Sequence, residues 1–339
     1  MVARSAGSDA IQRNCRSGQR AELSIPIDIR GMLPGVRVTI LSGGVGGARF
    51  TLGVLAAAPA AAVTVIANVG DDLEHWDLHV SPDVDTVLYT LSGRVGELGW
   101  GVRDDTRGAM GVVAELGGAA WFILGDRDVG LHVVRTARLR AGEPLSVIVA
   151  DVAARLSVPV TVIPATDGRL RTVLETDRGA LPFQDWLVRR RAEPRVSAIR
   201  FDGAGVAPAP GVLAAISGAD RVLLAPSNPF ISLDPILAVG GVRDAVTARR
   251  DDVVAVSPII AGRAVKGPLG ELLDSLGHDR SALGVARYLA PLAATFVLDH
   301  ADALHRPAIE ALGMRVVVAD TLMRDPAVRA ALARTALAA

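Results

Sequence analysis

The sequence predicts an α/β fold with a Rossmann-like, mostly parallel sheet, helices on both faces and a smaller inserted subdomain. Short continuous runs of valine, isoleucine and leucine recur along the chain, as in strands buried on both faces. Amphipathic stretches separate these runs, as helices separate parallel strands. Small and polar residues follow most of the runs, at the strand ends where open α/β sheets bind their ligands.

Eight apolar runs, spread along the whole chain, are predicted strands. They cover residues 36–41, 63–67, 121–124, 158–163, 221–225, 253–256, 295–298 and 314–318. The clearest helical patterns lie between or after them, at residues 48–57, 86–91, 129–140, 144–156, 269–276 and 327–337. Residues 168–207 break this rhythm, and we expect an inserted hairpin and helix there. Residues 35–339 are thus expected to form a single α/β domain.

The composition excludes several classes of partner. Lysine plus arginine and aspartate plus glutamate are both 36 of 339 residues, so the net charge is zero. Nothing in the bulk charge attracts the chain to nucleic acid or to a membrane, and phosphate binding must be local to particular loops. The lone Cys15 cannot form an internal disulfide, which is typical of the reducing cytoplasm. We therefore expect a cytoplasmic protein that binds small molecules.

The N-terminal 34 residues differ from the rest of the chain. They are rich in arginine, serine and glycine and contain no apolar run long enough for a signal peptide or a membrane span. We expect residues 1–34 to be a disordered extension, with Met32 as a second possible start of the chain.

The loop after the first predicted strand reads Ser-Gly-Gly-Val-Gly-Gly and leads into a helix. Gly43, Gly44 and Gly46 would let the backbone approach a ligand closely, and a helix N-terminus favours anionic phosphate. Arg49, one turn further on, would add a positive charge. The pattern is no dinucleotide fingerprint, because the third glycine position is Arg49 and no acid ends the second strand. It is no P-loop either, because no Gly-Lys-Ser/Thr follows. The alternative is a tight turn without a ligand.

The densest group of acids follows the second predicted strand. Asp71 and Asp72 come directly after it, and Asp83 and Asp85 follow a Ser-Pro pair that is typical of a helix start. These acids could simply complement the helix dipole. Beside a phosphate-binding loop, however, they could hold magnesium or orient an attacking hydroxyl. We expect at least one of these four acids to have such a role.

Weaker candidates lie in the other loops. Trp76 could stack on a flat heterocycle or cover the core. Asp126 and Arg127 follow the predicted strand at 121–124 and could be a ligand contact or an internal ion pair and helix cap. His132 lies one turn later and could face the same cleft. As isolated signals these are weak.

Two further loops are candidates for donor binding. Ser227 and Asn228 lie between two prolines that fix the backbone, so their side chains could be aimed at a ligand. Ser257 and Lys266 belong to a second, basic and glycine-containing loop, whose alternative is a solvated surface loop. The chain contains no zinc-ligand spacing, no Gly-x-Ser-x-Gly and no HExxH, so zinc and nucleophilic-triad chemistry are unsupported.

Taken in order, these loops resemble the 2-phospho-L-lactate transferase family of coenzyme F-420 biosynthesis. The resemblance runs from about residue 36 to residue 323. The segments that carry it are LSGGVGGARF, ANVGDD, SPDVDTVLYTLSG, GWGVRDDT, WFILGDRD, LPFQDWLVRRR, APSNP, AVSPIIAGRAVKGP and ADTLM. One position departs from the pattern: Ile123 stands where some relatives have a basic residue.

The resemblance implies a reaction. The terminal ribityl hydroxyl of the deazaflavin Fo (7,8-didemethyl-8-hydroxy-5-deazariboflavin) attacks the phosphorus that carries a three-carbon acid in a guanosine diphosphate conjugate. GMP leaves, and a phosphodiester to Fo forms. The acid could be 2-phospholactate, phosphoenolpyruvate or 3-phosphoglycerate, and the resemblance does not distinguish them. It also implies a magnesium-dependent homodimer.

The resemblance also implies roles for the candidate residues. Asp71, Asp83 and Asp85 would be catalytic, with Asp71 and Asp83 as magnesium ligands. Fo would be bound by Asp85 above all, together with Asn68, Trp76, Thr86, Asp126, Arg127 and His132. The donor phosphates and guanosine would be bound by Gly43, Gly44, Gly46, Arg49, Ser227, Asn228, Ser257 and Lys266.

Two other functions compete with this one. A sister family with the same glycine-rich turn and fold would make the chain a non-catalytic regulator that binds nucleotide sugars, but residues 81–92 and 124–128 favour the transferase. A nicotinamide-dependent oxidoreductase is opposed by the misplaced glycine and the missing ribose acid.

Overall fold

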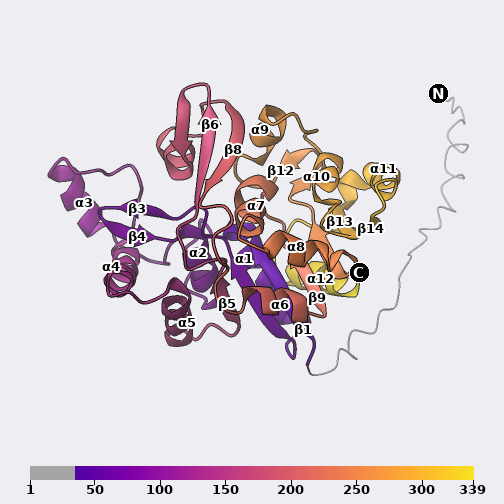
Figure 1. The fold of residues 1–339 in the computed structure, drawn as a ribbon, viewed down its shortest axis with the longest axis horizontal. Coiled ribbons are helices and arrows are strands. Elements are labelled where there is room, and N and C mark those ends of the chain that lie inside the picture. Colours follow the sequence, from indigo (N-terminus) through magenta and orange to yellow (C-terminus); the bar gives the residue numbers. More distant parts are fainter. Residues whose placement is uncertain (1–34) are drawn as a thin grey trace, which may run out of the picture. The chain divides into compact units, whose positions relative to one another are not determined.

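A seven-stranded sheet forms the centre of the fold in the computed structural model, which describes residues 35–339 (Figure 1). The strand order is β14-β13-β10-β9-β1-β2-β5, and every neighbouring pair is parallel. The bounds are β1 (Arg37–Ser42), β2 (Ala62–Ala67), β5 (Thr161–Pro164), β9 (Arg221–Leu224), β10 (Val253–Val256), β13 (Thr295–Asp299) and β14 (Arg315–Ala319). The predicted parallel α/β class is confirmed. The expectation for residues 1–34 lies outside the described residues.

Helices surround this sheet. Helix α1 follows β1 directly and packs against both α12 and α2, while α6 packs against α8. The helices are α1 (Gly44–Ala57), α2 (Pro82–Leu91), α3 (Gly108–Glu115), α4 (Asp126–Arg140), α5 (Leu145–Arg155), α6 (Val212–Gly218), α7 (Asp234–Leu237), α8 (Val242–Thr247), α9 (Leu269–Ser275), α10 (Ala282–Leu289), α11 (Arg306–Glu310) and α12 (Pro326–Ala338). Within residues 35–339, none of them is long and apolar enough to cross a membrane.

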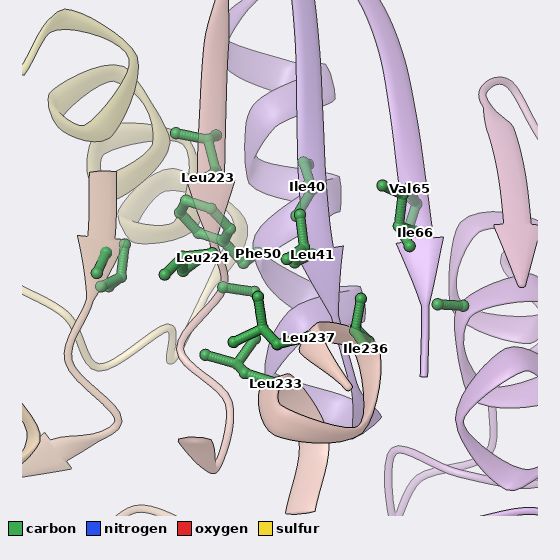
Figure 2. Close-up of a cluster of buried hydrophobic side chains, with 14 of the residues drawn as sticks. Ile40, Leu41, Phe50, Val65, Ile66, Leu223, Leu224, Leu233, Ile236 and Leu237 are labelled. Carbon is green, nitrogen blue, oxygen red and sulfur yellow. The ribbon is translucent and has the colours of Figure 1, made fainter. Parts of the chain in front are cut away.

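The core lies between the sheet and these helices. Figure 2 shows side chains of β1, β2 and β9 meeting Phe50 of α1 and the apolar residues of α7 and the turn before it. Ile40 and Leu223 are fully buried, as is Phe50. The strands read as continuous apolar runs because both faces of each strand are covered. This packing fixes where each strand ends, and so where the loops of its carboxyl end begin.

Smaller sheets flank the central one. Residues 171–202 form an antiparallel sheet of order β7-β6-β8, with a short π-helical segment between β7 and β8. A hairpin of β3 and β4 precedes α2, and a second short hairpin, of β11 and β12, follows β10. The bounds are β3 (Leu73–His75), β4 (Leu78–Val80), β6 (Arg171–Thr176), β7 (Gly179–Pro182), β8 (Val196–Asp202), β11 (Ile259–Ile260) and β12 (Arg263–Ala264).

One predicted strand is wrong. Residues 121–124 form no strand and instead lead irregularly into α4. Phe122 and Leu124 face a cavity, and Ile123 is 45% exposed. A four-residue apolar run has the same composition whether it pairs in a sheet or lines a pocket, so periodicity alone misassigns it. Helix α2 starts at Pro82 with Ser81 at the N-cap position, as the Ser-Pro pair predicted.

The contact between α1 and α12 supplies a test of the fold. A Cβ at Gly53 would lie 2.4 Å from the backbone oxygen of Arg329, whereas a Cβ at Gly111 of α3 would meet nothing within 4 Å. We expect Gly53→Ala to lower the free energy of unfolding by about 1–3 kcal/mol through overpacking. Gly111→Ala should raise it by about 0.5–1 kcal/mol through helix propensity. Urea unfolding measures both, and equal effects of the two substitutions would contradict this packing.

Candidate active site

A cavity of about 670 Å³ lies at the carboxyl edge of the central sheet. The loops after β1, β2, β9, β10 and β14 line it, together with α2, α4 and the turn after β7. A volume of this size suits a substrate of nucleotide dimensions. Most of the predicted site residues meet here. They are Gly43, Gly44, Gly46, Arg49, Asp71, Asp83, Asp85, Thr86, His132, Ser227, Asn228, Ser257 and Lys266.

The glycine-rich turn between β1 and α1 is packed too tightly for side chains. A Cβ at Gly43 would lie 2.4 Å from the Cβ of Ser232, and one at Gly46 would lie 2.5 Å from the backbone oxygen of Pro226. The Ser227 hydroxyl donates a hydrogen bond to the Gly43 carbonyl oxygen (2.8 Å). The turn after β1 and the loop after β9 therefore form one unit. Ligand phosphates can approach its backbone because no side chain intervenes.

Asn68 connects two of the predicted catalytic acids. Its Nδ2 donates to Asp71 Oδ1 (3.0 Å) and to Asp83 Oδ2 (2.9 Å). Its Oδ1 accepts a hydrogen bond from the Gly70 amide (2.7 Å), which fixes the orientation of the side-chain amide. Asn68 itself is fully buried and does not line the cavity. It therefore lies behind the two acids and holds them, rather than facing a ligand.

Asp71 and Asp83 are both buried, and their negative charges repel each other. Burial raises the pKa of Asp71 well above its usual value, the Asp83 charge raises it further, and the bond from Asn68 opposes both. Burial likewise raises the pKa of Asp83 to about 6, against the same bond from Asn68. Two carboxylates held this close favour a proton or a cation between them.

These acids fit magnesium only as a shared site. Among residues 35–339, no group of three or more histidine, cysteine or acidic side chains could hold a metal ion. Magnesium is commonly held by one or two carboxylates, with water and substrate phosphate as its other ligands. Asp71 and Asp83 supply the two carboxylates, and the neighbouring glycine turn offers a place for the phosphates.

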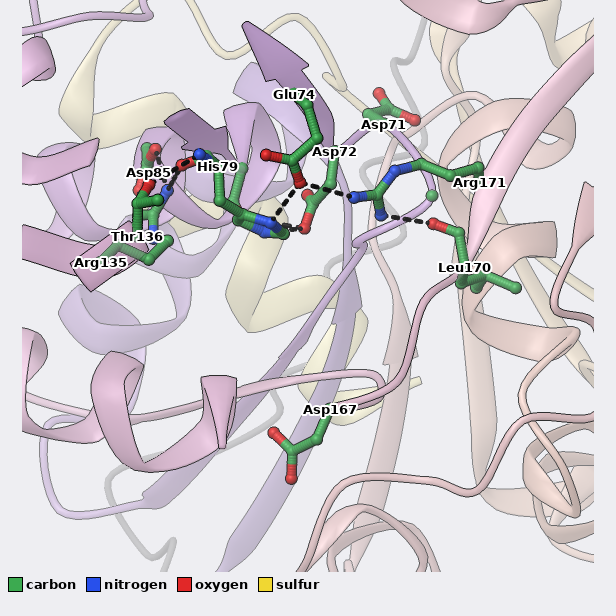
Figure 3. Close-up of polar contacts among 12 residues, drawn as sticks. Asp71, Asp72, Glu74, His79, Asp85, Arg135, Thr136, Asp167, Leu170 and Arg171 are labelled. Atoms are coloured by element: carbon green, nitrogen blue, oxygen red, sulfur yellow. Dashed lines mark hydrogen bonds and ion pairs between the residues drawn. The ribbon is translucent and has the colours of Figure 1, made fainter. Parts of the chain in front are cut away.

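Asp85 forms a buried ion pair that the sequence did not reveal. Its carboxylate accepts two hydrogen bonds from the guanidinium of Arg135 on α4, one of them at 3.0 Å, and Figure 3 shows the two side chains face to face. Arg135 is 1% exposed. Asp85 still lines the cavity, so it presents a carboxylate whose position is fixed from behind.

The second acid of the Asp-Asp pair points elsewhere. Asp72 accepts hydrogen bonds from the Ser81 hydroxyl (2.9 Å) and pairs with Nε2 of His79 (3.0 Å). The His79 ring also contacts Glu74, which reaches toward Arg171, as Figure 3 shows. This network ties the β3–β4 hairpin to α2 and to β6. Of the two adjacent acids, only Asp71 lines the cavity.

The cavity wall formed by α2 and α4 is polar. Burial lowers the pKa of His132 to about 4, and neither ring nitrogen has a hydrogen-bond partner within the described chain, although Nδ1 lies 3.7 Å from Asp85 Oδ2. Burial raises the pKa of Asp128 to about 6, and the Asp85 charge adds to the shift. Tyr89 and the apolar side chain of Phe122 complete this wall. Polar groups between apolar surfaces suit a flat heterocycle.

Besides Asn68, three predicted residues do not line the cavity. Trp76 donates from Nε1 to the Ala119 carbonyl oxygen (2.7 Å) and packs beside His75. Asp126 accepts hydrogen bonds from the start of α3, including the Ala109 amide (2.9 Å), so it acts as a helix cap. Arg127 donates to the carbonyl oxygen of Arg103 (3.0 Å). Asp126 therefore makes the alternative cap contact, Trp76 and Arg127 contact the backbone, and neither Asp126 nor Arg127 forms an ion pair within residues 35–339.

Sequence reasoning missed other residues of the wall. Phe183 and Gln184 come from the inserted segment, and Gln184 Nε2 donates to the Asp71 carbonyl oxygen (3.3 Å). Thr321 comes from the loop after β14. Each lies in a segment that carries the family resemblance, LPFQDWLVRRR or ADTLM, and that was the available signal. Tyr89 lay inside a predicted helix and gave no signal of its own.

Parallel strands with glycine-rich and acidic loops at their carboxyl edge define a Rossmann-like protein that binds ligands at that edge. The family model for 2-phospho-L-lactate transferase CofD matches residues 38–330. The chain belongs to this family and is a transferase.

Curated relatives agree with this assignment. The chain is 42% identical to a protein named phosphoenolpyruvate transferase from Streptomyces griseus, over 89% of this chain and 98% of the relative. It is 38% identical to a protein of the same name from Mycolicibacterium smegmatis, over 89% and 98%. A solved structure of a UPF0052 family member from Bacillus halodurans superposes with a TM-score of 0.59 at 15% identity, over 90% of this chain and all of that one, which supports the fold alone.

The Asp85–Arg135 pair supplies a stability prediction. Arg135→Met leaves the Asp85 carboxylate buried without a partner, and we expect it to cost about 3–5 kcal/mol of unfolding free energy. Adding Asp85→Asn should recover most of that loss. Arg138→Met on the same helix removes ion pairs with Glu143 and Asp151 that are more exposed, and it should cost much less. Urea unfolding of the wild type and of these three variants measures the differences. A double variant no more stable than Arg135→Met would refute the coupling between Asp85 and Arg135.

Asp83 supplies a pH prediction. Its folded-state pKa is about 6 against 3.8 without the fold, so between these values the folded protein keeps a proton that the unfolded chain has lost. Stability of the metal-free protein therefore falls as pH rises through this window. We expect Asp83→Asn to stabilise the metal-free protein by about 1–3 kcal/mol at pH 8 and much less at pH 4.

Thermal unfolding in a chelator from pH 4 to pH 8 measures this difference. Magnesium should then raise the melting temperature of the wild-type protein at pH 8 and have little effect on Asp83→Asn. A gain from Asp83→Asn that is independent of pH would contradict the shifted pKa.

Proposed function

We propose that the enzyme transfers phosphoenolpyruvate from a guanosine diphosphate conjugate to the deazaflavin Fo, with release of GMP. The terminal ribityl hydroxyl of Fo attacks the phosphorus that bears the enolpyruvyl group. A new phosphorus–oxygen bond forms to Fo, and the bond to the oxygen of GMP breaks. The hydroxyl proton is lost, and the product is a phosphodiester of Fo and enolpyruvate.

The observation that carries this proposal is the combination of family membership with the layout of the cavity. The relatives named phosphoenolpyruvate transferase match 89% of the chain at about two-fifths identity. Their name favours enolpyruvate over lactate or glycerate as the three-carbon unit. The layout of the cavity favours a nucleotide diphosphate beside a flat acceptor, because a glycine turn lies at its centre and the partly apolar α2–α4 wall lies next to that turn.

The donor is assigned to the glycine-turn side of the cavity. The backbone of Gly43, Gly44 and Gly46 begins α1, whose N-terminus favours the diphosphate. Asn228 turns its Oδ1 to the Phe230 amide (3.0 Å), which leaves Nδ2 as a buried donor without a partner in residues 35–339. Ser257 belongs to the same side. These groups would hold phosphate and guanosine oxygens.

Magnesium is the proposed cofactor, held by Asp71 and Asp83. When bound it would neutralise diphosphate charge as the bond to GMP breaks. The contribution of the chain is to hold the two carboxylates on the Asn68 amide, at hydrogen-bond distances of about 3 Å on each side. Phosphoryl transfer of this kind depends mainly on positioning and charge neutralisation.

Fo is assigned to the wall of α2 and α4. Asp85 would accept a hydrogen bond from a ribityl hydroxyl and orient it, with Arg135 holding the carboxylate from behind. Thr86 and His132 would contact the acceptor beside it. The resemblance further predicts a homodimer that works in the cytoplasm, and both remain proposals.

The test is turnover with defined substrates. Purified enzyme with magnesium, Fo and the enolpyruvyl conjugate of GDP should release one GMP for each Fo consumed, and mass spectrometry should detect the enolpyruvyl phosphodiester. The lactyl and glyceryl conjugates are the matched alternatives. Release of no GMP with any of the three would sink the proposal, and preference for another conjugate would correct the three-carbon unit.

Asp85 can be tested in the same assay. Asp85→Asn keeps the shape of the side chain but removes its charge, and we expect kcat to fall by about 100-fold or more, as for other positioned acid or base groups. Asp251→Ala, an exposed acid before β10, is the control and should be near wild type. Unchanged turnover by Asp85→Asn would overturn its role.

A further inference from the structure

Two positive side chains in the cavity wall have no acidic partner. Three lysine or arginine side chains line the cavity: Arg49 on α1, Lys266 in the loop after β12, and Arg324 after β14. Arg324 pairs with Asp320. Neither Arg49 nor Lys266 forms an ion pair within residues 35–339. An anionic ligand in the cavity would therefore meet two unneutralised cations.

The surroundings of Lys266 favour an anion at this place. Its Nζ donates to the carbonyl oxygen of Leu98 (2.7 Å), a neutral acceptor. Burial lowers the pKa of Lys266, and the Arg49 charge lowers it further, so the two cations are close enough to repel. A single anion between them would relieve this repulsion and form charge-assisted hydrogen bonds with both.

The geometry of the transfer decides which anion belongs there. In an in-line displacement the attacking and leaving oxygens lie on opposite sides of the phosphorus. The three-carbon group must then project sideways from the line that joins Fo to GMP. Arg49 lies one turn beyond the glycine turn, beside the proposed diphosphate position, and Lys266 lines the same cavity.

We propose that Arg49 and Lys266 bind the carboxylate of the transferred three-carbon acid and not the phosphates, an inference that rests on the proposed function. The phosphates already have the backbone of the glycine turn, the amide of Asn228 and the Asp71–Asp83 site. The carboxylate distinguishes the donor from GDP itself. The two cations thus select a nucleotide that carries the acid over one that does not.

The first test separates the carboxylate from the diphosphate. Arg49→Met and Lys266→Met should each lower kcat/KM for the enolpyruvyl conjugate by about 30-fold, as expected for loss of a charge-assisted hydrogen bond. The Kd for GDP with magnesium, measured by calorimetry, should change by less than about twofold. Arg263→Met is the matched control, because Arg263 is exposed in β12, shortly before Lys266, but does not line the cavity.

A donor with its carboxyl group methylated completes the cycle. Wild-type enzyme should lose a similar factor with this ester, while the two variants should lose little more. If GDP binding weakens as much as turnover, the cations bind phosphate and the inference falls. If the variants act like wild type, it falls as well. Failure of the wild-type enzyme to use any conjugate would instead refute the proposed function.

The chain offers an independent measurement, because Lys266 is its only lysine. Acetylation by an amine-reactive ester, followed by peptide mass spectrometry, reports the accessibility of this one side chain. The enolpyruvyl conjugate should slow the labelling about fivefold or more in the absence of Fo, whereas GDP with magnesium should not. Equal protection by GDP would assign Lys266 to the diphosphate and overturn the inference.

Discussion

The site depends on one side-chain amide that holds two buried carboxylates. Asn68 joins Asp71 and Asp83, and its Nδ2 also approaches the Ile231 carbonyl oxygen (3.2 Å). It therefore ties together the loop after β2, the start of α2 and the segment after β9. Burying two like charges is unfavourable without a counter-charge. The fold supports this arrangement because the β1–β2–β9 core fixes the positions from which the three segments leave the sheet.

The glycine turn makes that arrangement possible. A Cβ at Gly43 would lie 2.8 Å from Asp83 Oδ2 as well as against Ser232, so a side chain there would displace the acid. Gly44 adopts a φ of +62°, which L-residues rarely do. Glycine is therefore required in this turn for two reasons. It leaves room for the buried acids, and it keeps the backbone accessible to a ligand. A glycine pattern read only as a phosphate loop misses the first requirement.

Much of the fold could be predicted from the sequence, and the errors have physical causes. Seven of the predicted strands exist because a strand covered on both faces is a continuous apolar run. The run at 121–124 failed because a cavity wall has the same composition. The site was harder: Asp71 and Asp72 are adjacent, and only their partners determine which one faces the cavity. Arg135, the partner of Asp85, lies on another helix, and no local pattern connects the two.

The distribution of charge explains how one cavity can accept two different substrates. On the α2–α4 wall, the Asp85 carboxylate is matched by Arg135, and burial keeps His132 neutral, so this side attracts no strongly charged group. Around the glycine turn, Asp71 and Asp83 favour a bound cation, whereas Arg49 and Lys266 favour a bound anion. A magnesium diphosphate with a pendant carboxylate meets both demands at once, whereas an uncharged heterocycle meets neither. In the proposed reaction, these charges would direct the two substrates to opposite sides of the reacting phosphorus.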